Sequence, residues 1–138
     1  MALQYSVTLR NNQLDQTEST AGASAVLRLY SGSVPATTAT ATSGTMLLSI
    51  TLPSDWMAAA ASGSKAKLGT WSGTGDAGAG TGTAAGYWRL WESTISTCHI
   101  QGTVTITGGG GDLTLDNTSI ASAQTVVINT FTLTAGNA

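Results

Sequence analysis

Short stretches in which apolar and polar residues alternate, each bounded by turn-forming residues, recur along almost the whole chain. They lie at 3–10, 24–32, 45–53, 64–73, 86–93, 97–107, 113–121 and 124–134. Alternation places every second side chain on one face of an extended strand, so each stretch predicts a strand with one face toward a core. Strands at such spacing predict an all-β, single-domain β-sandwich or jelly roll of roughly eight strands, with at most two short helices.

Length and charge narrow the class of protein. The 138 residues fit one domain, 1–138, and an apolar fraction of 41% with a net charge of −2 argues against global disorder. Five Lys and Arg residues are too few for the basic surface that nucleic acids or anionic membranes require. The sequence shows no apolar run of membrane-spanning length, no signal peptide, and a single cysteine that cannot form an internal disulfide.

Four stretches lack clear strand alternation. The polar stretch 11–22 predicts either one or two helical turns ended by Gly22 or a loop, and 33–44 is a low-complexity connector. The alanine-rich stretch 54–63 predicts one or two helical turns or a bent strand. The glycine-rich stretch 72–86 predicts a flexible loop, and it lacks the lysine that a phosphate-binding loop requires.

Cys98 and His99 are the only cysteine and histidine and are neighbours in the sequence, which raises the question of a catalytic pair. Strand alternation places Cys98 on an apolar face with Ile100 and Val104, and His99 on the opposite, polar face. Side chains that diverge in this way cannot form a nucleophile–base pair or readily share a metal. We therefore expect Cys98 to be a small buried residue and His99 an exposed one, with pH sensing or an interface as its alternative role.

The carboxylates suggest two further sites, each with a simpler explanation. Asp112 and Asp116 could converge on calcium, but their spacing matches no known loop and Asp is common in turns. Glu92, beside Trp88 and Trp91, is the one candidate for a glycosidase carboxylate, although an aromatic core strand explains this stretch better. We predict no catalytic, cofactor or metal site and no enzymatic activity.

The aromatic stretch 86–93 carries large side chains on both faces, with Trp88 on one and Tyr87 and Trp91 on the other. The second face is consistent with an interface, with a covering loop or with a carbohydrate-stacking surface. The candidate partner-binding residues, expected on outward faces, are Arg28, Tyr30, Tyr87, Arg89, Trp91 and His99.

Three segments carry a resemblance to a known family: "LRLYSG", "LPSDWMAAAASGSKAK" and "CHIQGTVTITGGGGDLTLDNTSIASAQTVVINTFTLTAG". In these strand-and-turn patterns, and in the open Gly/Thr loop between them, the chain resembles small virion proteins of tailed bacteriophages. It is most similar to the capsid cementing, or decoration, proteins of podophages. The resemblance covers nearly the whole chain in layout, and its motifs are strand and turn patterns rather than a chemical signature.

The resemblance implies a jelly-roll protein that binds the outer surface of a phage capsid and cements neighbouring subunits. The implied partners are the phage major capsid protein and a second copy of the chain in a homodimer, with no nucleic acid, membrane or cofactor. The implied location is the capsid surface of the virion, after assembly in the host cytoplasm. The alternative is a tail-fibre or adhesin-like module that recognises a carbohydrate through exposed aromatic residues.

Overall fold

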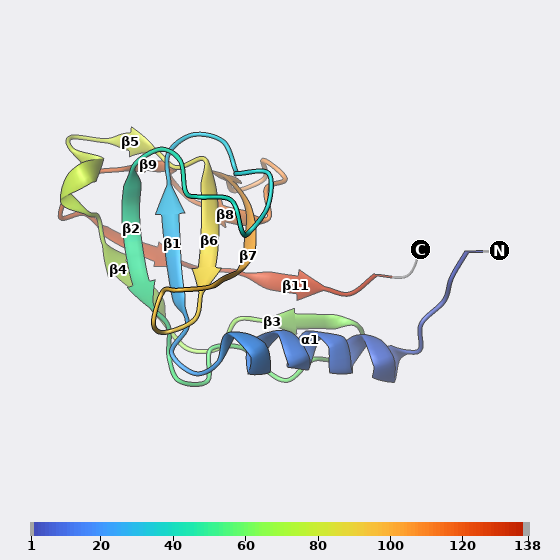
Figure 1. Cartoon of the computed structure of the whole chain (residues 1–138). Coiled ribbons are helices and arrows are strands. Elements are labelled where there is room, and N and C mark those ends of the chain that lie inside the picture. The colour runs from blue at the N-terminus through green and yellow to red at the C-terminus, as the bar shows by residue number, and fades with distance from the viewer. Residues whose placement is uncertain (1, 137–138) are drawn as a thin grey trace.

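The computed structural model describes residues 2–136, which form a β-rich domain with one α-helix packed at one end (Figure 1). The first half contains α1 (Val7–Ala21), β1 (Val26–Tyr30), β2 (Met46–Thr51), β3 (Ser64–Ala66), β4 (Trp71–Thr74) and the 3-10 turn η1 (Ala77–Ala79). The second half contains β5 (Thr83–Ala84), β6 (Tyr87–Trp91), β7 (Cys98–Ile106), β8 (Leu113–Leu115), β9 (Ser119–Ile120), β10 (Thr125–Ile128) and β11 (Thr132–Thr134). The expected all-β, sandwich-like single domain is confirmed, with eleven short strands among the described residues rather than roughly eight.

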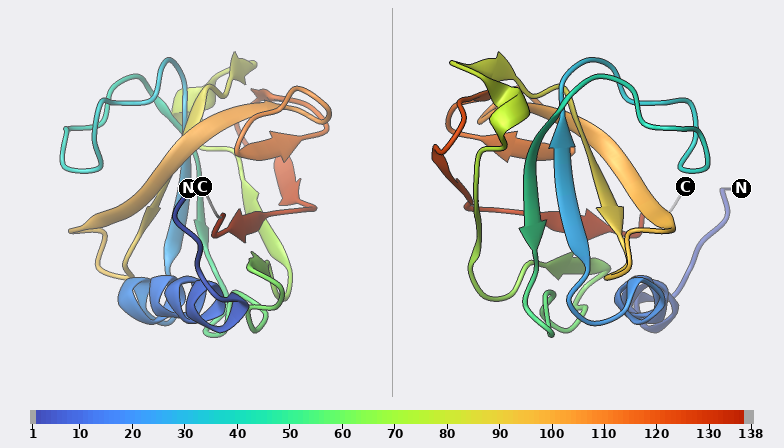
Figure 2. Two further views of the ribbon diagram at one scale, coloured as in Figure 1. Left: turned by 90° about the vertical axis from the view of Figure 1, so that its right-hand side faces the viewer. Right: turned by 60° about the vertical axis from the view of Figure 1, so that its left-hand side comes forward.

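The main sheet has the strand order β2-β1-β6-β7-β8 and is antiparallel except for the β7–β8 pair. Three two-stranded ladders, β10–β4, β11–β3 and β5–β9, complete the fold. The two views of Figure 2 show that the long strand β7 curls across the sheet and that β4, β10 and β11 lie on one side of it. The molecule is therefore two layers that enclose one core.

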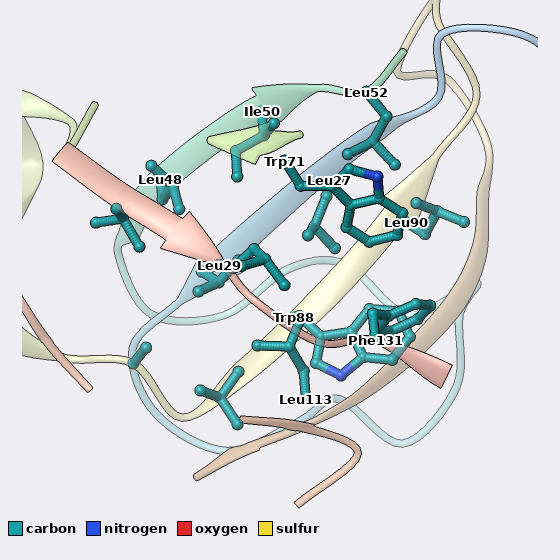
Figure 3. Packing of buried hydrophobic residues seen from close by; sticks show 14 of the residues in the cluster. Leu27, Leu29, Leu48, Ile50, Leu52, Trp71, Trp88, Leu90, Leu113 and Phe131 are labelled. Carbon is teal, nitrogen blue, oxygen red and sulfur yellow. The ribbon is translucent and has the colours of Figure 1, made fainter. Parts of the chain in front are cut away.

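The core between the layers is built from aliphatic side chains of the main sheet and an aromatic cluster (Figure 3). Leu27 and Leu90 are fully buried on the inner face of the sheet. The ring of Phe131 lies 5.2 Å from Trp71 and 5.2 Å, edge-on, from Trp88. Buried aromatic pairs of this kind contribute beyond their area alone, so this cluster joins the two layers.

The N-terminal prediction of a strand over 3–10 is wrong. Residues 2–6 carry no regular secondary structure, and α1 begins after Ser6, whose hydroxyl accepts a hydrogen bond from the Leu9 backbone N–H at 3.2 Å. This is an N-cap, which satisfies a donor that the first helical turn leaves unpaired. The helix ends at Gly22, with φ of 80°, where the sequence predicted that a helix would end.

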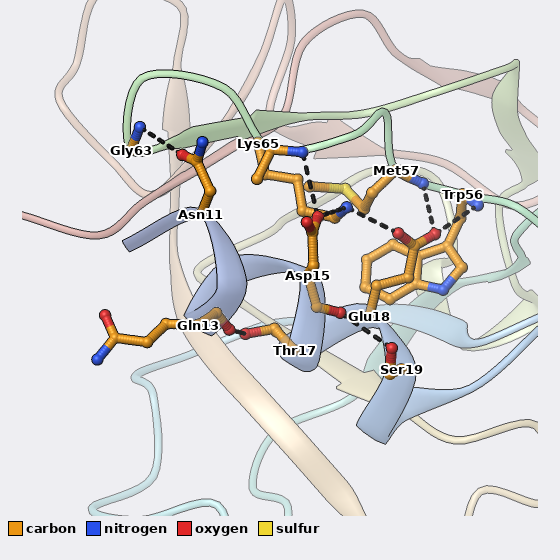
Figure 4. Close-up of polar contacts among 11 residues, drawn as sticks. Asn11, Gln13, Asp15, Thr17, Glu18, Ser19, Trp56, Met57, Gly63 and Lys65 are labelled. Carbon is orange, nitrogen blue, oxygen red and sulfur yellow. Dashed lines mark hydrogen bonds and ion pairs between the residues drawn. The ribbon is translucent and has the colours of Figure 1, made fainter. Parts of the chain in front are cut away.

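Side chains of α1 explain why 54–63 is not a helix (Figure 4). One oxygen of Glu18 accepts hydrogen bonds from the backbone N–H groups of Trp56, at 3.1 Å, and Met57, at 2.9 Å. The Gly63 N–H donates to the Asn11 side chain at 2.8 Å. With these donors bound to another element, 54–63 is an irregular segment with isolated bridges at Met57 and Ala61, so its helical alternative is wrong.

A buried lysine completes the attachment of α1. The Lys65 ammonium, only 3% exposed, lies 2.7 Å from an oxygen of Asp15 and 3.0 Å from one of Glu18. Burial alone would lower the pKa of Lys65, but its hydrogen bonds to these two carboxylates outweigh burial and raise it. The bond from Lys65 lowers the pKa of Asp15 in turn.

The glycine-rich stretch 72–86 contains local structure. It includes the end of β4, the turn η1 and β5. The Asp76 side chain accepts a hydrogen bond from the Gly78 N–H at 2.9 Å, and Ala79 is 1% exposed. The predicted flexibility of this stretch stays a prediction, while its backbone follows a defined path along the edge of the core.

Candidate functional site

A bulge in β7 decides where Cys98 and His99 lie. In the β6–β7 pairing Leu90 is opposite Ile100, but the next pair is Trp91 with Cys98, so His99 is the extra residue. The bulge shifts the side-chain alternation by one position and places Cys98 on the Trp91 side of the sheet. The expectation that Cys98 shares the core face with Ile100 is therefore wrong, although Cys98 is buried, at 7% exposed, as predicted.

The two side chains line different grooves. Cys98 lines a groove with Arg89 and Trp91, whereas His99 lines a groove against α1 together with Leu14 and Leu133. This supports the prediction that they do not form a catalytic pair. Burial raises the pKa of the Cys98 thiol, and the nearby Arg89 charge offsets this only in part, so the thiol stays protonated near neutral pH.

His99 is not the exposed residue that alternation predicts. Its side chain is 20% exposed, and its Nε2 lies 3.9 Å from a carboxylate oxygen of Glu92. Within residues 2–136, Nε2 is enclosed and has no hydrogen-bond partner. The groove beside it has a volume of about 470 Å³, and its lining also includes Ile100, Thr134 and the Gln and Thr side chains of α1.

The outer face of the main sheet is covered by the connector between β1 and β2, residues 31–45, which we call the covering loop. Figure 1 shows it crossing in front of β6 and β7, and Figure 2 shows it on the side away from β4 and β10. The Tyr87 hydroxyl donates to the Ser43 carbonyl and accepts from the Ser43 N–H, at 3.0 Å. The rings of Tyr87 and Tyr30 stack with their centroids 5.0 Å apart.

Arg89 is the second attachment point of the covering loop. Its Nη2 donates to the Thr37 carbonyl at 3.1 Å and to the Thr40 carbonyl at 2.8 Å. Its Nε donates to the Gln101 side-chain oxygen at 3.1 Å, and the Gln101 amide donates to the Pro35 carbonyl at 2.6 Å. The polar residues of this face are thus matched to backbone groups of the loop.

These contacts correct the expected exposure of three candidate partner-binding residues. Tyr30, Tyr87 and Arg89 are 4%, 0% and 1% exposed, because the covering loop shields the face that alternation predicted to be outward. Of the three interpretations of this face, the covering loop is confirmed for them. Arg28 and Trp91 are partly exposed, so among the candidate partner-binding residues of this face these two keep accessible surface.

A groove of about 490 Å³ lies where the covering loop meets the β6–β7 turn, and we call it the loop groove. Its lining residues are Thr38, Ala39, Thr40, Ala41, Thr42, Arg89, Trp91, Ser96, Thr97 and Cys98. The Arg89 guanidinium carbon lies 5.7 Å from the centroid of the Trp91 ring, a cation–π distance. Sequence reasoning found Arg89 and Trp91 but missed 38–42, because nothing in that low-complexity stretch indicates that it folds back over β6.

The remaining carboxylates are engaged in local hydrogen bonds. Glu92 accepts from the Ser96 and Thr94 hydroxyls and the Thr97 N–H, and these bonds, the Ser96 bond foremost, lower its pKa. It thereby closes the β6–β7 turn.

Asp112 and Asp116 bind different partners. Asp112 accepts from the Thr103 N–H at 2.8 Å and from the Thr103 hydroxyl at 2.9 Å, which lowers its pKa. Asp116 accepts from the Thr107 hydroxyl and the Asn129 amide. Within residues 2–136, no group of three or more His, Cys, Asp or Glu side chains could hold a metal ion.

Together, the fold and the loop groove define a β-sandwich-like domain with one polar sheet face enclosed by its own chain. The chain matches no model of a known family, no curated protein and no solved structure. Helix α1, the one α-helix of residues 2–136, is too short and too polar to cross a membrane.

Proposed function

We propose that the chain is a structural virion protein that binds the outer surface of a phage capsid and cements neighbouring major capsid protein subunits. The observation that carries the proposal is a run of exposed apolar side chains before and at the start of α1. Leu3, Val7 and Leu9 are 63%, 51% and 44% exposed. Figure 1 shows that this end of α1 extends beyond the main sheet. Exposed apolar side chains that follow one another in a short segment can make protein contacts, so this N-terminal segment is a suitable anchor for a capsid subunit.

The low surface charge supports the same proposal. Charged residues make up 9% of the chain, where about 25% is usual in soluble domains. Such a surface gives little like-charge repulsion, which favours lasting contact with a large assembly. The same property is compatible with a homodimer, which sedimentation velocity of the purified chain would detect.

The test is to locate the protein on particles and then to remove the anchor. Tagged protein is expressed in infected cells, and purified particles are labelled with gold and imaged. Regular label over the heads supports the proposal, label confined to tails moves the protein to the fibre class, and unlabelled particles overturn both. A Leu3→Ser/Val7→Ser/Leu9→Ser variant should bind heads at least tenfold more weakly. An Ile106→Ser/Val127→Ser variant is the matched control, because these side chains are also exposed, at 56% and 46%, and lie elsewhere on the surface.

A carbohydrate-binding module is a second candidate function, which the loop groove favours. Trp91 is partly exposed there and is surrounded by the hydroxyl-bearing residues Thr38, Thr42 and Thr97. An aromatic ring beside several hydroxyl groups is a common way to hold a sugar ring. A glycan array with the wild type and a Trp91→Ala variant tests it: binding that depends on Trp91 supports this function, and an array without binding argues against it.

A further inference from the structure

We propose that the loop groove binds the carboxylate of an acidic sugar, such as a hexuronic acid, with Arg89 as its cationic partner. This inference rests on the carbohydrate-binding candidate and is independent of capsid binding. Its starting point is a buried positive charge without a negative partner. Arg89 is 1% exposed, and its hydrogen-bond acceptors are all neutral: Gln101, Thr37 and Thr40.

The other buried cation of the domain shows what is missing at Arg89. Lys65 is 3% exposed and has two carboxylate oxygens within 3.0 Å. Among residues 2–136, no Asp or Glu oxygen lies within the 4.0 Å ion-pair distance of Arg89. A buried charge is unfavourable unless an opposite charge or enough hydrogen bonds compensate it, so an anion supplied from outside would complete this site.

The guanidinium has a free donor where such an anion could arrive. Nε and Nη2 hold Gln101 and the covering loop, whereas Nη1 donates to no group within residues 2–136. The fully enclosed polar side-chain atoms without a partner in that range are the Trp88, Trp91 and His99 nitrogens. Nη1 is not one of them, so it is not fully enclosed, and Arg89 lines the loop groove. A carboxylate placed there would accept a charge-assisted hydrogen bond.

The lining of the groove favours a sugar as the carrier of the carboxylate. The hydroxyls of Thr38 and Thr42 take part in no hydrogen bond with residues 2–136, so they are available to ring hydroxyl groups, whereas the Thr97 side chain is hydrogen-bonded to Glu92. Trp91 supplies an aromatic ring beside Arg89. The volume of about 490 Å³ is in the range of small-ligand sites. None of the lining residues is acidic, and one cation matches the single charge of a carboxylate better than the double charge of a phosphate.

The test compares two sugars that differ only in the carboxylate. The full-length chain is titrated with methyl β-glucuronide and with methyl β-glucoside, and amide NMR shifts are followed. We expect the glucuronide to bind at least tenfold more tightly, with shifts at 38–42 and 96–98. Equal binding of both sugars would overturn the role of the carboxylate while leaving the carbohydrate-binding function intact. Failure of both to bind would overturn the two together.

Variants of the chain and a third ligand, acetate, test the role of the carboxylate and the role of the sugar ring separately. Arg89→Gln should abolish the preference for glucuronide, with circular dichroism and amide spectra checking that the fold is kept. Thr42→Val removes a free hydroxyl from the rim and should weaken the binding of both sugars severalfold while keeping the preference for the glucuronide. Lys67→Gln is the matched control, because Lys67 lies 5.7 Å from the ring of Trp71, outside the groove. If acetate binds as tightly as the glucuronide, the sugar is not recognised and the proposal is overturned as stated.

Discussion

The two faces of the main sheet are both buried, but by different means. On the inner face Leu27 and Leu90 belong to the same buried cluster as the aromatic residues that join the two layers. On the outer face Tyr87 and Arg89 are enclosed by hydrogen bonds to the backbone of the covering loop. Alternation in a sequence therefore shows which side chains share a face, but the element that covers a face decides whether it reaches solvent.

The two faces differ in the kind of interaction that keeps them buried. Apolar packing contributes about 25 cal/mol for each Å² removed from water and does not depend on a few directed contacts. A single hydrogen bond contributes a net of about 1 kcal/mol, and ordering each loop residue costs about as much. The covering loop should therefore open locally, at far less than the free energy of global unfolding, while the inner face stays packed.

The largest effect should come from the inner face. Trp88→Ala removes a ring that contacts Phe131 and leaves a cavity, so we expect the free energy of unfolding to fall by about 3–5 kcal/mol. Urea denaturation followed by circular dichroism measures the loss. Val127→Ala, at a side chain that is 46% exposed, should change the value by less than about 0.5 kcal/mol. A loss below about 1 kcal/mol in Trp88→Ala would show that the inner face is not the main source of stability.

A charged contact away from both faces should give an intermediate effect. Lys65→Met leaves Asp15 and Glu18 side by side without their cation. Because Asp15 is 47% exposed and water compensates part of the loss, we expect a decrease of about 1–2 kcal/mol in stability. The same urea experiment on Lys67→Met, whose ammonium joins no ion pair within residues 2–136, should show almost no change. Equal losses in the two variants would mean that the ion-pair network contributes nothing.

The outer face should respond more weakly and locally. Tyr87→Phe removes the hydroxyl that binds Ser43 on both of its backbone groups, and we expect a loss of about 1 kcal/mol. Hydrogen exchange should accelerate at the Ser43 amide but not at the amides of β1. Tyr30→Phe is the control, since the stacked ring is kept and no loop contact is lost. Uniform acceleration through both regions would show that the covering loop and the core open as one unit.

Lowering the pH should weaken the hydrogen bonds at the ends of the sandwich before it affects either face of the main sheet. The pKa values of Glu92 and Asp112 lie below their ordinary values of 4.5 and 3.8, so their stabilising effect is full above those values. It is lost as the pH falls through the lowered values. Protection factors, which correct for the pH dependence of intrinsic exchange, should therefore fall first at the amides of Thr97 and Thr103 between pH 5 and 2, because these carboxylates bind them. Asp112→Asn should remove the effect at Thr103. Earlier acid loss of protection at Ser43 would contradict this prediction, because the groups that bind the Ser43 backbone and the covering loop within residues 2–136 are not carboxylates.

Most strands could be predicted because their alternation matches a real sheet environment, as in β1, β2 and β6. The N-terminal strand failed because alternation at 3–10 has no strand to pair with, and the Ser6 cap and the contacts of Glu18 stabilise a helix instead. The end of that helix at Gly22 could be predicted, since it depends on a local backbone conformation.

The candidate site was only partly predictable for a related reason. Arg89 and Trp91 stood out by residue type, but the partners of Arg89 on the covering loop are backbone carbonyls, which any residue could supply. The bulge at His99 also has no sequence signal, although it decides the side of the sheet on which Cys98 lies. Both features depend on tertiary pairing rather than on local pattern.

The uneven burial of the four tryptophans gives the molecule a built-in optical reporter. Trp56, Trp71 and Trp88 are at most 2% exposed, whereas Trp91 is partly exposed at the loop groove. Iodide or acrylamide should therefore quench the fluorescence of Trp91 selectively and leave the emission of the other three nearly unchanged. Changes in the quenchable fraction would report events at that one groove in unlabelled protein, whether a bound ligand shields the ring or an opened loop exposes it further.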